Sequence, residues 1–141
     1  MDRFELDWEK AAREAARFIQ QFMEKAGRSR GVIGLSGGID STVSAYLAAR
    51  ALGPSRLHAF LLPYRTSSEH SQEDAMLVIR ELDLPYEVVE ITPMVDAYFD
   101  RYPDADRIRR ANMMARQRMA VLYDQSERLD ALVIGTGNRT E

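Results

Sequence analysis

The amino-acid sequence predicts an α/β fold in which a twisted parallel β-sheet carries helices on both of its faces. Short runs rich in β-branched residues alternate along the chain with longer segments whose apolar residues recur every three or four positions. Parallel strands need crossover connections, which helices supply, and these crossovers are right-handed. Ligands of such sheets bind beyond the carboxyl ends of the strands, so we expect a site at that edge.

The first strand is predicted between two helices. A helix over residues 7–25 ends at Gly27, and its apolar face is expected to pack against the rest of the domain. A buried strand at residues 31–35 then leads directly into a helix over residues 41–52. The residues that give the first helix its period are Trp8, Ala11, Ala12, Ala15, Phe18, Ile19 and Phe22.

The same alternation continues to the end of the chain. A strand at residues 57–62 precedes a polar loop and a helix over residues 73–82, for which Thr66 with Glu69, or Ser71 with Asp74, offers a capping box. The remaining elements are a strand at 86–91, a short segment at 95–99, a long helix at about 106–127 and a strand at 131–134.

Length and composition limit the classes of function. The 141 residues predict one domain, and the net charge of −3 provides no overall positive field for nucleic acid. Without cysteine, the chain has no disulfide, thiolate metal site or cysteine nucleophile. The sequence has no signal peptide and no apolar stretch long enough to span a membrane, so we expect a cytoplasmic protein.

The most informative motif is the loop between the first strand and the next helix, Ser36-Gly37-Gly38-Ile39-Asp40-Ser41-Thr42. Two glycines let backbone N–H groups approach an anion, and a helix N-terminus adds partial positive charge. A carboxylate beside such a phosphate site suits Mg²⁺, which prefers oxygen ligands. The loop is neither a Walker A nor a dinucleotide-binding G-x-G-x-x-G motif.

This motif resembles the signature of the PP-loop ATP pyrophosphatases, which have an adenine nucleotide alpha hydrolase-like, Rossmann-like fold. Three further strings resemble bacterial ammonia-dependent NAD synthetases in particular. They begin at Leu62, Asn112 and Gly135, and read LPYRTSS followed by QEDA, NMMARQRM, and GTGNRTE. Those enzymes continue for roughly as much chain again, so we expect residues 1–141 to be a synthetase domain incomplete at its C-terminus.

The resemblance implies a set of site residues. Catalytic roles fall on Asp40, Ser36 and Ser41, and Mg²⁺ would be held by Asp40 and Glu141. Deamido-NAD would be bound by Asn112, Arg116, Arg118 and Asn138. The alternative for Arg116 is a solvated basic helix face, since Arg107, Arg109 and Arg110 lie nearby. ATP would be bound by Leu35, Ser36, Gly37, Gly38, Ile39, Asp40, Ser41, Thr42, Arg65, Gln72 and Thr136.

The implied reaction is the ATP-dependent amidation of deamido-NAD to NAD with ammonia, through an adenylated intermediate, with release of pyrophosphate and AMP. Relatives of this kind form homodimers, so a homodimer is expected. Two alternatives remain open: a tRNA-modifying PP-loop enzyme, which the acidic charge and missing cysteines disfavour, and a nucleotide-binding module without activity.

Overall fold

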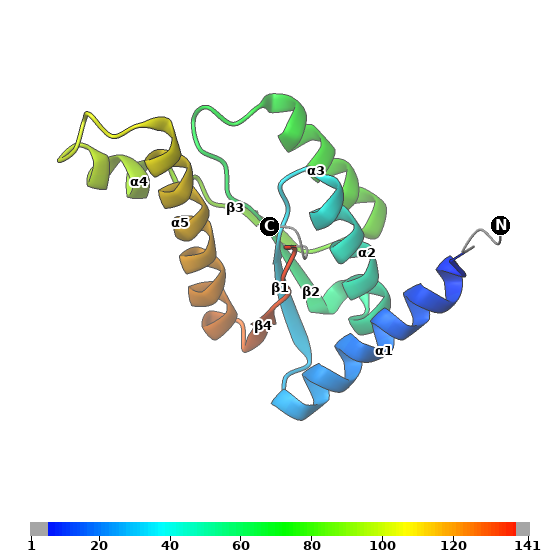
Figure 1. Cartoon of the computed structure of the whole chain (residues 1–141). Helices are drawn as coiled ribbons and strands as arrows, with labels where there is room; N and C mark the ends of the chain where they lie inside the picture. Colours follow the sequence, from blue (N-terminus) through cyan, green and yellow to red (C-terminus); the bar gives the residue numbers. More distant parts are fainter. Residues whose placement is uncertain (1–5, 138–141) are drawn as a thin grey trace.

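The computed structural model describes residues 6–137 and confirms the predicted α/β class (Figure 1). Its strands form one parallel sheet in the order β3-β2-β1-β4. Gly31 pairs with Leu57 on one side and with Leu132 on the other, so β1 lies in the interior of the sheet. The strands are β1 (Arg30–Gly34), β2 (Leu57–Leu61), β3 (Tyr86–Val88) and β4 (Ala131–Val133).

Helices cover both faces of this sheet, as predicted. Successive residues of a strand point to opposite faces, so Val32 and Ile33 enter two different apolar cores. Ile33 packs with α2 and α3, and Val32 packs with α4 and α5. The helices are α1 (Trp8–Ala26), α2 (Ile39–Leu52), α3 (Glu69–Leu82), α4 (Thr92–Phe99) and α5 (Arg107–Arg128), with a 3-10 turn η1 (Pro54–Arg56) before β2.

The start of α3 corrects the sequence prediction. Neither predicted capping box forms, because the N-cap is neither Thr66 nor Ser71. The chain before the helix makes a tight turn, in which Tyr64 N–H donates to the Ser67 hydroxyl oxygen at 2.9 Å. That turn presents the next residue, Ser68, as the N-cap, and its hydroxyl accepts a hydrogen bond from Ser71 N–H at 3.1 Å. The helix therefore begins at Glu69, four residues before the predicted start.

The third strand is shorter than predicted. Only Tyr86–Val88 has regular pairing, and all three residues are exposed because β3 lies at one edge of the sheet. Val89 N–H and Ile91 N–H continue to donate to the Leu61 and Pro63 carbonyls, but in irregular geometry. The chain then turns into α4.

The first helix is correctly predicted, but the expectation that its apolar face is packed is only partly met. Ala16 and Met23 are buried, and α1 lies against α2. Trp8, Phe18 and Phe22 remain 76%, 66% and 58% exposed. The described helices include none that is both long and apolar enough to cross a lipid bilayer.

Candidate functional site

The β1–α2 loop is held in shape by the hydroxyl groups of its own residues. Ser41 is buried, and its hydroxyl donates to the Gly38 carbonyl at 3.1 Å while accepting from Ser36 N–H at 3.3 Å. Thr42 Oγ1 also donates to the Gly38 carbonyl, at 2.9 Å, and Gly38 N–H donates to Ser36 Oγ at 3.2 Å. These bonds place Ser36 at the surface and occupy Ser41 internally, so Ser41 acts here on the loop conformation.

Gly37 joins this loop to the start of α3. Its φ of +83° is in the left-handed region, and a Cβ atom there would lie 2.3 Å from the Ser71 carbonyl oxygen. Only glycine fits such a contact without displacing backbone. The motif therefore contains one glycine needed for close packing, whereas Gly38 has an ordinary φ of −79°.

The N-terminus of α2 lacks a side-chain cap. Asp7, Ser68 and Asp106 cap α1, α3 and α5, whereas the N-caps of α2 and α4, Gly38 and Ile91, make no side-chain hydrogen bond to their helices. The first amides of an α-helix have no partner within the helix, and the helix dipole favours an anion beside them. Asp40 lies in the same first turn and is half-buried.

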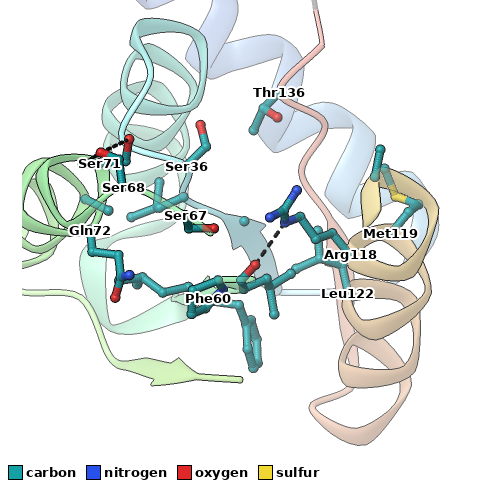
Figure 2. A pocket seen from close by; sticks show the side chains of 17 residues that line it. Ser36, Phe60, Ser67, Ser68, Ser71, Gln72, Arg118, Met119, Leu122 and Thr136 are labelled. Carbon is teal, nitrogen blue, oxygen red and sulfur yellow. Dashed lines mark hydrogen bonds between the residues drawn. The ribbon is translucent and has the colours of Figure 1, made fainter. Parts of the chain in front are cut away.

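A cavity of about 400 Å³ opens beside this loop at the carboxyl ends of β1 and β2. Figure 2 shows Ser36, Ser68 and Ser71 on one side of it, with Arg118 on the opposite side. The floor is apolar, and the rim carries hydroxyl, amide and guanidinium groups. Lining residues include Leu35, Phe60, Leu62, Ala75 and Leu122 among the apolar groups, and Ser67, Gln72 and Thr136 among the polar ones.

Arg118 is the charged residue of α5 that lines this cavity. Its Nε donates to the Leu62 carbonyl at 2.9 Å, which orients the guanidinium across the carboxyl end of β2 (Figure 2). Burial lowers the pKa of Arg118 below its ordinary value. A guanidinium group stays protonated in proteins, so the side chain carries a positive charge. A fixed cation therefore faces the uncapped helix N-terminus across the cavity.

The structure brings together only some of the predicted ligand-binding residues. Leu35, Ser36, Gln72, Arg118 and Thr136 line the cavity, and Gly37, Gly38, Ile39, Asp40 and Thr42 adjoin it in the loop or the start of α2. Asn138 and Glu141 lie outside the described residues.

Arg65, Asn112 and Arg116 do not line the cavity. Arg65 forms an ion pair with Asp96 of α4 and donates its backbone N–H to Thr92 Oγ1 at 2.9 Å. Asn112 and Arg116 are exposed on α5, and the Arg116 guanidinium donates to the Asn112 carbonyl at 3.2 Å. Arg116 and Arg118 lie about 200° apart around the helix, so one faces solvent when the other faces the sheet.

The site predicted from the sequence does not include the serine side of the rim. Ser67, Ser68 and Ser71 line the cavity, although each also has a turn or cap role. The sequence does show these serines as a serine-rich loop after the second strand. Such a loop predicts a ligand-binding site only when the order of the strands in the sheet is known. Within residues 6–137, no group of three or more His, Asp or Glu side chains is arranged to hold a metal ion.

Comparison with known proteins gives consistent matches. The family model described as NAD synthase matches residues 11–141. An NH(3)-dependent NAD(+) synthetase of Trichlorobacter lovleyi is 48% identical over 141 residues, which is all of this chain and 52% of that protein. The corresponding protein of Fusobacterium nucleatum is 42% identical, with 55% of its length covered. The chain thus spans about half the length of the curated relatives it matches.

Solved structures give the same match and confirm the predicted fold. An NH3-dependent NAD synthetase from Campylobacter jejuni, in complex with the nitrate ion, has a TM-score of 0.90 and 37% identity. That match covers 96% of this chain and 59% of the other. A glutamine-dependent NAD+ synthetase from Acinetobacter baumannii, in complex with ADP, has a TM-score of 0.91 and 28% identity, over 100% of this chain and 28% of the other.

Proposed function

Because this chain belongs to the NAD synthase family, we propose that it binds ATP and takes part in the amidation of deamido-NAD by ammonia to give NAD. The observation that carries the proposal is the uncapped N-terminus of α2, which opens beside a cavity that Arg118 closes on the far side. The relative from A. baumannii holds ADP, which supports an adenine nucleotide as the ligand.

ATP would place its polar and apolar parts on matching surfaces of this site. The base and ribose would lie on the cavity floor, where Gln72, Thr136 and the serine hydroxyls could donate or accept hydrogen bonds. The phosphates would then lie over Ser36, Gly37 and Gly38, where the first amides of α2 donate to them. Arg118 would bind a phosphate or carboxylate oxygen through the guanidinium nitrogens that Leu62 does not use.

The proposed chemistry has two balanced steps. A carboxylate oxygen of the nicotinate attacks the α-phosphorus of ATP, and the bond to the β-phosphate oxygen breaks and releases pyrophosphate. Ammonia then attacks the activated carbonyl carbon, loses a proton, and expels AMP. The α2 amides would stabilise the charge that develops on the departing pyrophosphate, and the rigid loop would hold the reacting groups in line.

Asp40 fits the coordination of Mg²⁺. Magnesium at nucleotide sites is commonly held by one or two carboxylates together with substrate phosphates, and Asp40 is placed in the first turn beside the phosphate-binding amides. Bound there, the ion would neutralise phosphate charge. We propose Asp40 as one ligand, and Glu141 as the second on the strength of the resemblance.

We propose a homodimer in which the deamido-NAD site includes the exposed face of α5. Ile108, Asn112, Arg116 and Tyr123 lie within about 80° of one another around this helix, and Ile108 and Tyr123 are 72% and 60% exposed. Binding roles for Asn112 and Arg116 are compatible with their distance from the cavity only if the substrate extends to that face. A monomeric mass at assay concentration would contradict the dimer.

The test is pyrophosphate release by the 141-residue chain with ATP and Mg²⁺, in which deamido-NAD and ammonium are each added or withheld. We expect ATP to bind and deamido-NAD to stimulate release. ATP binding without release under any combination would instead support the nucleotide-binding module. Release stimulated by tRNA and not by deamido-NAD would favour the tRNA-modifying alternative, and a chain that binds no ATP would refute the proposal.

A further inference from the structure

A second, smaller cavity lies at the opposite end of the sheet from the candidate site. It has a volume of about 200 Å³ and opens at the amino ends of β1 and β2, where Gly31 pairs with Leu57. We call it the amino-edge cavity. None of the described residues that line it is acidic, and three of them can carry a positive charge. Its polar and charged lining residues are Arg30, Ser55, Arg56 and His58.

Arg30 and Arg56 bring two cations to this cavity without counter-ions. Each immediately precedes a residue of the first β1–β2 pair, so the two lie side by side in register. Both are exposed, and neither guanidinium makes a hydrogen bond or an ion pair within the part of the chain that the structure describes. The nearby Arg28, by contrast, forms an ion pair with Asp130. Arginine stays protonated and binds oxyanions through two parallel N–H groups, so both side chains suit an anionic ligand.

His58 adds a third group that an anion would engage. Its ring stacks on Phe60 with centroids 4.9 Å apart, and its Nε2 is buried without a hydrogen-bond partner among the described residues. Nε2 lies 3.6 Å from the Glu87 carboxylate, which already accepts from Arg128 at 2.7 Å. Burial lowers the pKa of His58, Arg128 acts in the same direction, and Glu87 opposes both. A protonated imidazole donates from both nitrogens, so one can face Glu87 while the other binds an anion.

Charge and size decide which ligand fits. Leu129 lines the cavity as the C-cap of α5, and the partial negative charge of that helix end, about half an elementary charge, opposes an anion. The two guanidinium groups without counter-ions outweigh it and leave the cavity electropositive. Its volume is half that of the 400 Å³ cavity at the carboxyl ends of the strands, which favours a single phosphate group over a nucleotide.

We propose that the amino-edge cavity binds a doubly charged oxyanion of the phosphate class, held by Arg30, Arg56 and the His58 imidazole. The proposal does not depend on the proposed reaction, because the two cavities lie at opposite ends of the strands. Anion binding and protonation of His58 should favour each other, since the anion stabilises the imidazolium. The pKa of His58 without the anion lies below 6.5, and the anion raises it, so affinity should increase as the pH falls from about 7.5 to about 5.5.

The test is an NMR titration of the ¹⁵N-labelled 141-residue chain with sulfate at constant ionic strength. Sulfate is used because it stays doubly charged over this pH range. The amides of Gly31 and Leu57 report on the amino-edge cavity, and the amide of Gly38 reports separately on the other cavity. We expect saturable shifts at the first two, and Arg56→Gln should weaken the binding they report about fivefold or more. Arg17→Gln removes an exposed charge on α1 that does not line the cavity and should change it by less than about twofold.

The pH dependence is measured with the same amides. His58→Phe should leave an affinity for sulfate that no longer increases as the pH falls, because the titrating group is gone. The proposal is overturned by sulfate shifts confined to Gly38, by equal weakening from Arg56→Gln and Arg17→Gln, or by an unchanged pH dependence in His58→Phe. Parallel titrations with inorganic phosphate and glycerol phosphate identify the source of the anion. Tighter binding of the first supports a free anion as the ligand, tighter binding of the second supports a phosphate ester, and saturation of the site by neither contradicts the proposal.

Discussion

Replacing Gly37 by alanine tests the packing that shapes the β1–α2 loop. Two penalties should add in the folded state. Alanine at a φ of +83° costs about 1–2 kcal/mol, because Cβ approaches the following carbonyl oxygen in left-handed geometry. The new Cβ would also lie 2.3 Å from the Ser71 carbonyl oxygen, so the first turn of α3 must move by about 1 Å.

The expected total is about 2–5 kcal/mol of unfolding free energy, because overpacking a close contact typically adds about 1–3 kcal/mol. Gly27→Ala is the matched control. Gly27 has a φ of +69°, but a Cβ there meets nothing within 4 Å, so only the conformational penalty applies. The stabilising effect of alanine on the unfolded chain is common to both variants and cancels in the difference.

Urea unfolding followed by circular dichroism measures both variants, and ATP binding is measured on the folded protein. We expect Gly37→Ala to lose at least about 1 kcal/mol more than Gly27→Ala and to bind ATP more weakly, since the loop and α3 both line or adjoin the cavity. Equal destabilisation of the two variants, with ATP binding unchanged, would refute the argument that this contact shapes the loop.

Three further predictions concern single side chains. Asp40→Asn should greatly reduce Mg²⁺-dependent pyrophosphate release. Its cost in unfolding free energy should be no more than about 1 kcal/mol, which is the usual contribution of a negative charge at a helix N-terminus. Pyrophosphate release at the wild-type rate would exclude the ligand role. Asp96→Ala should destabilise the fold by about 1–3 kcal/mol in urea unfolding. The buried Tyr64 hydroxyl donates to Asp96 at 2.5 Å, and Arg65 forms an ion pair with the same carboxylate. The substitution leaves both side chains without this partner. Asp100→Ala, an exposed change at the end of the same helix, should have little effect, and equal losses would contradict the argument. Burial lowers the pKa of His58 below 6.5 and outweighs the opposing effect of Glu87, so the unfolded chain binds the proton more readily and stability should fall as pH drops below about 6.5. His58→Phe should reduce that slope in unfolding measured across this range, and an unchanged slope would show that other groups cause it.

The α5 helix shows where prediction from the sequence stops. Periodicity fixed its extent to within about a residue at either end and separated Arg116 from Arg118 by their angle around the axis. The resemblance implied substrate contacts for both arginines, and the helix period by itself does not say which of them faces the sheet. In the structure Arg118 faces the cavity because its Nε meets the Leu62 carbonyl, 56 residues away in sequence. The orientation of a helix about its own axis depends on the surface it packs against.

The same distinction applies to Arg65 and to α1. The resemblance placed Arg65 among the ATP-binding residues, and the structure pairs it with Asp96, 31 residues later, where α4 folds back beside the loop. The period of α1 correctly predicted a helix with an apolar stripe, yet periodicity does not say which part of that stripe a neighbour covers. Phe18 and Phe22 remain exposed because no described element lies over them.

By itself, the sequence determined the features that depend on neighbouring residues. These are the alternation of strands and helices, the glycine loop between β1 and α2, and the hydroxyl groups that hold it, since backbone conformation and helix capping act over a few residues. The tertiary structure decided which side chains share a cavity and which apolar face stays bare. Those outcomes depend on how the strands are ordered and how the helices rotate as they pack.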